Sequence, residues 1–205
     1  MQQRRGDEMQ ILEEKDLLSQ ESITVIFQPV VEVETNQVFG YKTLICNSEG
    51  APNTPDPYRR CQSIGELNEL KLSFLNIQLQ KAQEMGLDRV FIHVDSYLLR
   101  EMESISKPPG MEVVFEITDL ELLGDIQTCQ GIFVKWRAQG IQFAVDDFGS
   151  GFISLPIIAC LMPEYIKFDL SGMVQAVPFE ELKEIYKDLL LALRNYSRKG
   201  IFYTP

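Results

Sequence analysis

Residues 141–155 read IQFAVDDFGSGFISL, and this stretch decides which fold the chain is expected to adopt. The apolar run 141–145 is typical of a buried β-strand, yet it ends in two adjacent aspartates, Asp146 and Asp147. Two carboxylates this close repel each other unless a metal, a basic group or solvent compensates them. A solvated strand-to-loop junction with a glycine turn would also produce this pattern. Other parts of the sequence are therefore needed to distinguish an acidic site from a simple turn.

Short apolar strands and amphipathic helices alternate along the chain on both sides of this stretch. The β-rich runs 23–33 and 37–46 surround a short polar turn and predict a hairpin. Further strands are expected at 89–94, 111–118, 143–148, 165–170 and 200–204, and helices at 58–86, 96–104, 125–140, 153–161 and 179–200. This order predicts an α/β fold in which helices cover a parallel sheet, either doubly wound or closed as a barrel.

Length and composition fit one globular domain. The chain has 205 residues, with 45% hydrophobic and 24% charged residues, which is ordinary for a soluble protein. Apolar residues at helical spacing predict a lead-in helix within residues 1–20, and residues 21–205 then form the main domain. Neither a linker nor an internal repeat divides the sequence further.

Charge and cysteine usage exclude several classes of function. The formal net charge is −11, so bulk electrostatics oppose binding to nucleic acid. The four cysteines lack metal-ligand spacing and read as reduced, mostly buried residues of a cytoplasmic protein: Cys46, Cys61, Cys129 and Cys160. No apolar run reaches membrane-spanning length, the N-terminus lacks a signal-peptide core, and the single histidine, His93, excludes multi-histidine metal sites.

Polar side chains gather near the ends of three consecutive predicted strands. Glu116 ends one strand, Asp146 and Asp147 end the next, and Lys167 and Asp169 lie in the third. Sites in both candidate architectures are built where parallel strands end, so these groups are expected at one rim. Carboxylates with a lysine are what divalent-metal phosphoester chemistry needs, because oxygen ligands hold Mg²⁺ or Mn²⁺ while a cation neutralises phosphate charge.

These residues resemble the EAL domain of bacterial cyclic-di-GMP phosphodiesterases. The likeness runs from Ile23 to Tyr203, and its segments in chain order are IFQPVVEVETNQVFGYKTLI, FIHVDSYLL, VVFEITD, GIQFAVDDFGSGFISL and YIKFDLSGM. The resemblance implies a TIM-like (β/α) barrel whose first strand is antiparallel to the others. It also implies a site at the C-terminal rim that holds two Mg²⁺ or Mn²⁺ ions and opens one phosphodiester of the cyclic dinucleotide.

Several site residues match the family. Glu116 falls on its strand-end metal-binding glutamate, and Asp146 and Asp147 fall on its paired metal-binding aspartates. Lys167 falls on the lysine that assists the attacking water, and Gln28 matches a glutamine near the dinucleotide.

The motif that names the family is absent, because Lys42-Thr43-Leu44 stands where the family reads E-A-L. An ammonium in place of a metal-binding carboxylate repels a dication, so we expect Lys42 to form an internal ion-pair cluster with Glu116 and Asp146. A lysine that snorkels to the surface is the alternative. His93 stands where the family has a metal-binding asparagine. We expect His93 to hydrogen-bond within the rim rather than to ligate Mn²⁺ or Zn²⁺.

Cys46 replaces an arginine that contacts a ligand phosphate in the family, and it reads as a small buried hydrophobe. The last predicted strand stops at Pro205, and about seven strands can be counted where a closed barrel normally has eight. The barrel is therefore expected to be incomplete at the C-terminus, with an unclosed edge that further residues, a protein partner or a second copy would cover.

The sequence thus favours a catalytically inactive EAL-like regulator of cyclic-di-GMP signalling or motility, acting through a regulatory protein partner in the cytoplasm. No cofactor is expected, and Mg²⁺ or Mn²⁺ would be required only if the site were active. The alternatives are a non-hydrolysing cyclic-di-GMP receptor and an active metal-dependent phosphodiesterase. Nucleic acid and membranes are not expected as partners. The ligand-binding candidates are Gln28, Lys42, Cys46, His93, Asp147 and Lys167, and the remnant metal ligands are Glu116, Asp146 and Asp147.

Overall fold

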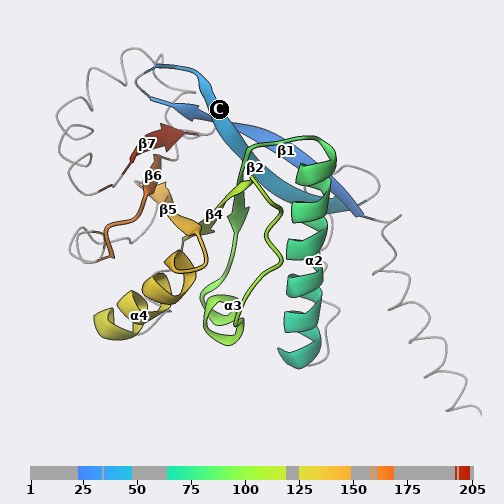
Figure 1. The fold of residues 1–205 in the computed structure, drawn as a ribbon, viewed down its shortest axis with the longest axis vertical. Coiled ribbons are helices and arrows are strands. Elements are labelled where there is room, and N and C mark those ends of the chain that lie inside the picture. The colour runs from blue at the N-terminus through green and yellow to red at the C-terminus, as the bar shows by residue number, and fades with distance from the viewer. Residues whose placement is uncertain are drawn as a thin grey trace, which may run out of the picture.

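The computed structural model describes residues 23–33, 35–47, 64–118, 125–148, 158, 161–168, 197 and 199–203. Within these residues, strands and helices alternate after an initial hairpin (Figure 1). The strands are β1 (Ile23–Glu32), β2 (Val38–Asn47), β3 (Arg89–His93), β4 (Glu112–Ile117), β5 (Ile141–Phe148), β6 (Tyr165–Phe168) and β7 (Gly200–Tyr203). The helices are α2 (Ile64–Glu84), α3 (Ser96–Glu101) and α4 (Ile126–Arg137).

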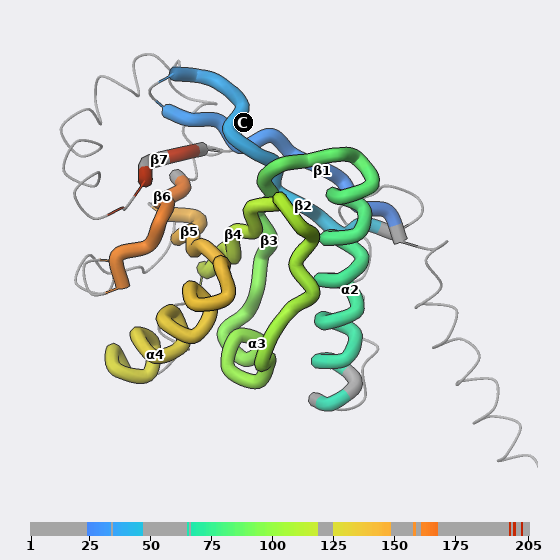
Figure 2. Tube along the Cα trace, in the orientation of Figure 1, coloured from blue at the N-terminus to red at the C-terminus, as the bar shows by residue number. Residues whose placement is uncertain are grey.

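The described strands close into a barrel in the order β1-β2-β3-β4-β5-β6-β7. Strand β1 is antiparallel to both of its neighbours, β2 and β7, and the strands from β2 to β7 are parallel to one another. A TIM-like barrel with an antiparallel first strand is what the resemblance to the EAL domain implied, and it excludes the doubly wound alternative. Figure 2 shows the chain running from the blue hairpin through the green and yellow strands to the red β7.

The expected open edge after the last strand is wrong for the described strands. Strand β1 continues past a bulge between Val30 and Val31, and its final residues pair with β7 through Val31↔Tyr203 and Glu32↔Phe202. Two residue pairs therefore bridge the gap, although the described residues contain seven strands rather than eight.

Capping residues explain where the helices begin and end. Asp95 Oδ1 accepts from Leu98 N at 2.8 Å at the start of α3, and Asp125 caps α4 in the same way. Helix α2 is followed by Gly86, whose φ of 67° suits glycine and ends the helix where the sequence predicted. Helix α3 is shorter than expected, because Met102 is already extended. Among the described helices, none is long and apolar enough to cross a membrane.

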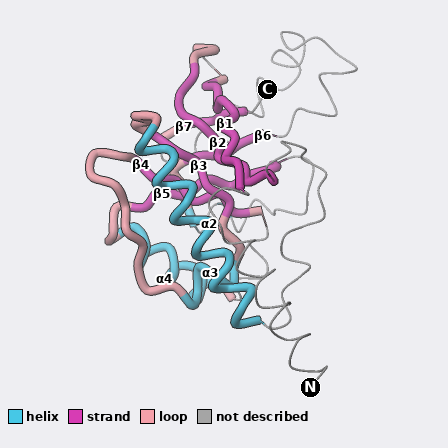
Figure 3. Tube along the Cα trace, turned by 90° about the vertical axis from the view of Figure 1, so that its right-hand side faces the viewer, coloured by secondary structure: helices cyan, strands magenta, loops and turns pink. Residues whose placement is uncertain are grey.

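Two layers of apolar side chains hold the barrel together. The larger core lies between the strands and the helices, which lie together on one side of the strands in Figure 3. The smaller core fills the barrel interior and consists of Val30, Phe91, Val114, Ala144, Tyr165 and Phe202. Side chains alternate along each strand, so the residues two positions further toward the C-terminal rim also point into the barrel. The interior core lies directly beneath them and forms a floor.

Parts of the sequence-based prediction lie outside the described residues. These include the lead-in helix within 1–20 and most of the helices expected at 153–161 and 179–200. The division into residues 1–20 and 21–205 therefore stays a prediction.

Candidate functional site

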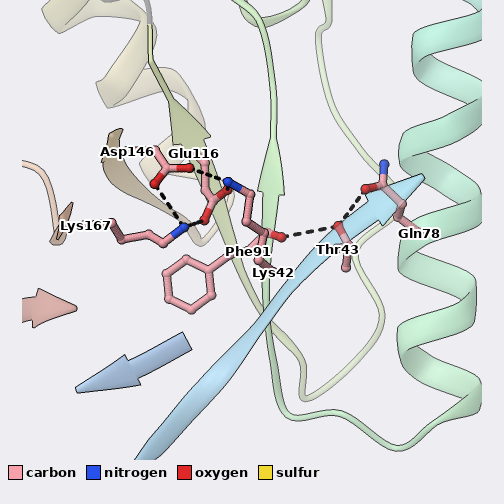
Figure 4. Close-up of polar contacts among 7 residues, drawn as sticks. All are labelled: Lys42, Thr43, Gln78, Phe91, Glu116, Asp146 and Lys167. Carbon is pink, nitrogen blue, oxygen red and sulfur yellow. Dashed lines mark hydrogen bonds and ion pairs between the residues drawn. The ribbon is translucent and has the colours of Figure 1, made fainter. Parts of the chain in front are cut away.

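Four charged side chains from four strands meet above the aromatic floor of the barrel (Figure 4). We call them the four-charge ring: Lys42 of β2, Glu116 of β4, Asp146 of β5 and Lys167 of β6. Each belongs to the inward-facing set of its strand, which the period-two alternation of a strand requires. The ion pairs that the sequence predicted between Lys42 and both carboxylates are confirmed.

Each ammonium bridges the two carboxylates and uses a different oxygen of each. Lys42 Nζ lies 2.6 Å from Asp146 Oδ2 and 3.2 Å from Glu116 Oε2. Lys167 Nζ lies 3.1 Å from Asp146 Oδ1 and donates a short hydrogen bond to Glu116 Oε1. All four carboxylate oxygens therefore face an ammonium, and with both lysines protonated and both carboxylates ionised the ring has no formal net charge.

A local irregularity in β5 separates the two aspartates. The pairing of β5 with β6 shifts register between Val145 and Phe148, and Asp147 has a φ of 53°. A bulge of this kind re-aims side chains, so Asp146 is buried in the ring whereas Asp147 is exposed. The DD motif thus divides into one buried and one solvent-facing carboxylate.

Burial and charge act in opposite directions on the ring. Burial would raise the pKa of Asp146, but the Lys167 and Lys42 ammoniums outweigh it and hold that pKa at about 2. Burial would lower the pKa of Lys42, but Glu116 and Asp146 hold it above the ordinary lysine value. Asp146 is therefore ionised and Lys42 is protonated at neutral pH.

Glu116 is the most enclosed member of the ring, with no exposed surface. Burial raises the pKa of Glu116, and Lys167 opposes the shift without cancelling it. Its Oε2 accepts no hydrogen bond from the described residues, because Lys42 Nζ provides an ion pair at 3.2 Å without hydrogen-bond geometry.

The other predicted site residues lie around the ring. Gln28 is the cross-strand partner of Lys42, and His93 is the neighbour of Glu116 in the β3–β4 pair, with its side chain exposed. Cys46 lies two inward-facing positions beyond Lys42 on β2 and is a buried free thiol, as expected of a small hydrophobe. The hydrogen bonding expected of His93 stays a prediction.

Two features of the site were not predicted from the sequence. Lys167 Nζ lies 5.7 Å from the centre of the Phe91 ring, so the barrel floor supports the buried ammonium. Thr43 donates a 2.6 Å hydrogen bond to Gln78 Oε1, which ties the strand carrying Lys42 to helix α2. The alternation of β3 places Phe91 on the same face as His93 and was a signal for the contact between Phe91 and Lys167. The sequence held no signal for the hydrogen bond between Thr43 and Gln78.

Within the part of the chain that the structure describes, no group of three or more histidine, cysteine, aspartate or glutamate side chains is arranged to hold a metal ion. The two buried carboxylates are arranged around ammonium groups instead.

Comparison with known proteins identifies the family. Residues 10–201 match the EAL domain, and the chain belongs to the EAL domain family. It is 26% identical over 204 residues to the uncharacterized EAL-domain containing protein YkuI of Bacillus subtilis, covering 90% of this chain and 49% of YkuI. It is 22% identical over 152 residues to the blue light- and temperature-regulated antirepressor BluF of Escherichia coli, covering 69% and 38%. It is 23% identical over 193 residues to the probable cyclic di-GMP phosphodiesterase PdeN of Escherichia coli, covering 86% and 37%.

Solved structures share the fold. YkuI in complex with its substrate cyclic-di-GMP and calcium aligns with a TM-score of 0.64 and 20% identity, covering 93% of this chain and 51% of that one. A manganese and cyclic-di-GMP complex of Klebsiella pneumoniae BlrP1 aligns with a TM-score of 0.68 and 17% identity, covering 89% and 49%. Divalent cations and the dinucleotide thus occur together in structures of this family, and the chain spans about half or less of the relatives it matches.

Proposed function

We propose that this chain is a catalytically inactive regulator in bacterial cyclic-di-GMP signalling or motility control, and that it acts by binding a protein partner. The observation that carries the proposal is the position of Lys42 Nζ, 2.6 Å from Asp146 Oδ2 and 3.2 Å from Glu116 Oε2. An ammonium at these distances lies where two carboxylates would otherwise hold a cation.

The residues of the ring do not fit a pair of divalent ions in this arrangement. Mg²⁺ and Mn²⁺ need several oxygen ligands, and the oxygens of Glu116 and Asp146 are already paired with Lys42 and Lys167. At an effective dielectric of about 20, a dication about 4 Å from the Lys42 ammonium meets about 8 kcal/mol of repulsion. Hydrolysis that depends on two metal ions would have to overcome this repulsion between Lys42 and a dication before substrate is bound.

Binding to a protein is supported by the surroundings of the ring. With all four of its groups in their charged forms the ring has no formal net charge, and Cys46 provides no cation for a phosphate. Beyond Thr43, the last β2 residue that pairs with β3, the hairpin continues and presents the exposed cross-strand pair Ile26 and Leu44. Apolar surface beside a closed polar site suits a protein partner, and the relative BluF is named an antirepressor. We place this interaction in the cytoplasm.

A second candidate is a receptor that binds cyclic-di-GMP without hydrolysing it. The structures of YkuI and BlrP1 contain the dinucleotide, which favours this candidate. Gln28 lies opposite Lys42 on the hairpin, and the exposed part of the Lys42 side chain could meet a phosphate at the mouth of the site.

Calorimetric titration of cyclic-di-GMP into the protein, with Mg²⁺, Mn²⁺ or a chelator present, separates these functions. The regulator proposal expects no heat of binding under any of the three conditions. Binding that survives the chelator would support the receptor, whereas binding that requires a metal would contradict the regulator proposal and leave the receptor and the enzyme, which the hydrolysis assay then separates.

A hydrolysis assay completes the test. The wild-type chain is expected to release no linear dinucleotide with either metal. Product formation by the wild-type chain, abolished by chelator, would refute the proposed function. The Lys42→Glu variant measures how much of the family's site remains, because it restores the carboxylate that the E-A-L motif supplies.

A further inference from the structure

We infer that the outward face of helix α4 is a self-association surface, on which a second copy of this chain packs its own α4 in the antiparallel direction. The face consists of four exposed residues, which we call the α4 seam: Gln127, Gly131, Val134 and Ala138. In Figures 1 and 3, α4 lies toward the bottom of the molecule, away from the β1–β2 hairpin at the top. The inference goes beyond the proposed function, because it does not use the four-charge ring.

The α4 seam has the spacing of a helix that packs against another helix. Its residues follow one another at intervals of four, three and four positions, which places them on one face. The opposite face of α4 is buried in the core through Cys129, Ile132, Phe133 and Trp136. Val134 is 65% exposed, the highest value among the bulky apolar residues of the described chain. A second helix on the seam would remove this side chain from water.

The absence of charge along α4 favours a second copy as the occupant. The formal charge of −11 makes two copies of this chain repel each other over their surfaces as a whole. Residues 126–134, which read IQTCQGIFV, contain no charged side chain, although 24% of the chain is charged. Two copies that meet along α4 therefore bring no like charges into contact at the centre of the seam.

The shape of the seam sets the register of the pair. When two seams pack antiparallel, Val134 of each copy faces Gly131 of the other, and Gln127 faces Ala138. Gly131 leaves room for this contact, since a Cβ atom built there meets no atom within 4 Å. The side chain of Val134 thus fills the gap above Gly131, and the two-fold symmetry of the pair makes this contact twice.

The charges at the two ends of α4 favour the antiparallel direction. Asp125 is exposed at the start of the helix, and Lys107 Nζ lies 3.4 Å from Gly140 O just beyond its end. The antiparallel register brings Asp125 of each copy beside Lys107 of the other. It also places the two helix dipoles in opposite directions, whereas a parallel pair would bring like ends together.

The length of α4 determines the strength of association that we expect. Residues 126–137 span about 18 Å at a rise of about 1.5 Å per residue. A single pair of such helices is smaller than the roughly 1,200–2,000 Å² interfaces of stable complexes. The dimer is therefore weak, and its population rises with protein concentration.

Sedimentation equilibrium of the whole chain over a range of concentrations tests the inference. The seam variants are Gly131→Gln and Val134→Gln, and the matched control is Met85→Gln, which removes an apolar side chain that is 61% exposed just beyond the end of α2. Gly131→Gln fills the gap that Val134 of the second copy would enter. It should keep the fold, because its Cβ enters open space and glutamine is a better helix former than glycine. Fluorescence of Trp136, which is buried in the core, reports whether each variant is folded.

We expect the wild-type chain and Met85→Gln to approach a dimer as the concentration rises, and each seam variant to weaken dimerisation at least about tenfold. A wild-type chain that stays monomeric up to roughly 1 mM would overturn the inference and leave the seam to a different protein. A dimer that neither seam variant weakens would also overturn it, because the contact would then lie elsewhere. If one seam variant fails to fold, the other decides in the same way.

A charge substitution tests the antiparallel direction. Lys107→Glu places a carboxylate beside Asp125 of the second copy and should weaken the dimer roughly fivefold. Adding Asp125→Asn should recover part of this loss, because asparagine still caps α4 but no longer repels the new glutamate. A loss that Asp125→Asn does not relieve would overturn the antiparallel register.

Discussion

The energetic coupling between Lys42 and Asp146 can be measured with a double-mutant cycle. Lys42→Met leaves two buried carboxylates with one lysine, and Asp146→Asn leaves two lysines with one carboxylate. Removing one partner of a buried ion pair costs about 3–5 kcal/mol of unfolding free energy. Because the Lys42 side chain is 17% exposed, we expect each single substitution to cost about 3 kcal/mol, at the lower end of that range.

The double variant should cost far less than the sum of the two. It retains the Lys167–Glu116 ion pair as a neutral unit, so we expect a total near 4 kcal/mol and a coupling of about 2 kcal/mol. Urea unfolding followed by Trp136 fluorescence measures all four chains, because Trp136 is the single tryptophan and packs on Phe115 in the core. The corresponding cycle at the exposed Lys81–Glu84 pair should show no measurable coupling. Additivity within about 0.5 kcal/mol at the ring would refute the ion-pair account of the site.

Two further substitutions test how the surrounding structure is held. Thr43→Val removes the donor to Gln78 Oε1 and should lower the free energy of unfolding by about 1–2 kcal/mol, measured by the same urea transitions; an unchanged midpoint would contradict this hydrogen bond. Glu164→Ala should cost about 3 kcal/mol, because Glu164 pairs with Arg137 at 2.9 Å and accepts from Phe143 N at 2.9 Å. Glu164→Gln, which keeps an acceptor for Phe143, should lose less than the alanine variant, and equal losses would argue against that second contact.

The order of strands and helices was predictable because its signals were local, whereas the choice of a barrel over a doubly wound sheet came from the resemblance to the EAL domain. Apolar residues at strand or helical spacing and glycine stops such as Gly86 each act within a few positions of the chain. The inward direction of Lys42 was also predictable, because strand alternation and the resemblance to the EAL domain placed it beside Glu116 and Asp146.

The remaining features depend on contacts between distant segments. The pairing of β7 with Val31 and Glu32 lies just past a register shift in the β1–β2 hairpin, where Phe39 of β2 has no cross-strand partner, and which residues pair across so long a sequence separation has no local signal. Strand alternation alone turns Asp147 away from Asp146, but it does not predict that Asp147 is exposed, since Phe143 and Val145 on the same face of β5 are buried. The resemblance gave Lys167 the role of assisting the attacking water, whereas its pairing with both carboxylates appears only when β4, β5 and β6 are assembled.

The neutrality of the ring has a consequence for how ligands approach it. The chain as a whole has a formal charge of −11, so long-range electrostatics favour the approach of cations over that of anions. The association rate of a dianionic ligand is therefore lowered by repulsion from the acidic chain, and added salt raises that rate by screening the repulsion. A cationic segment of a partner protein is attracted instead, so added salt lowers its association rate. The sign of the ionic-strength dependence of the association rate therefore distinguishes an anionic ligand from a cationic partner.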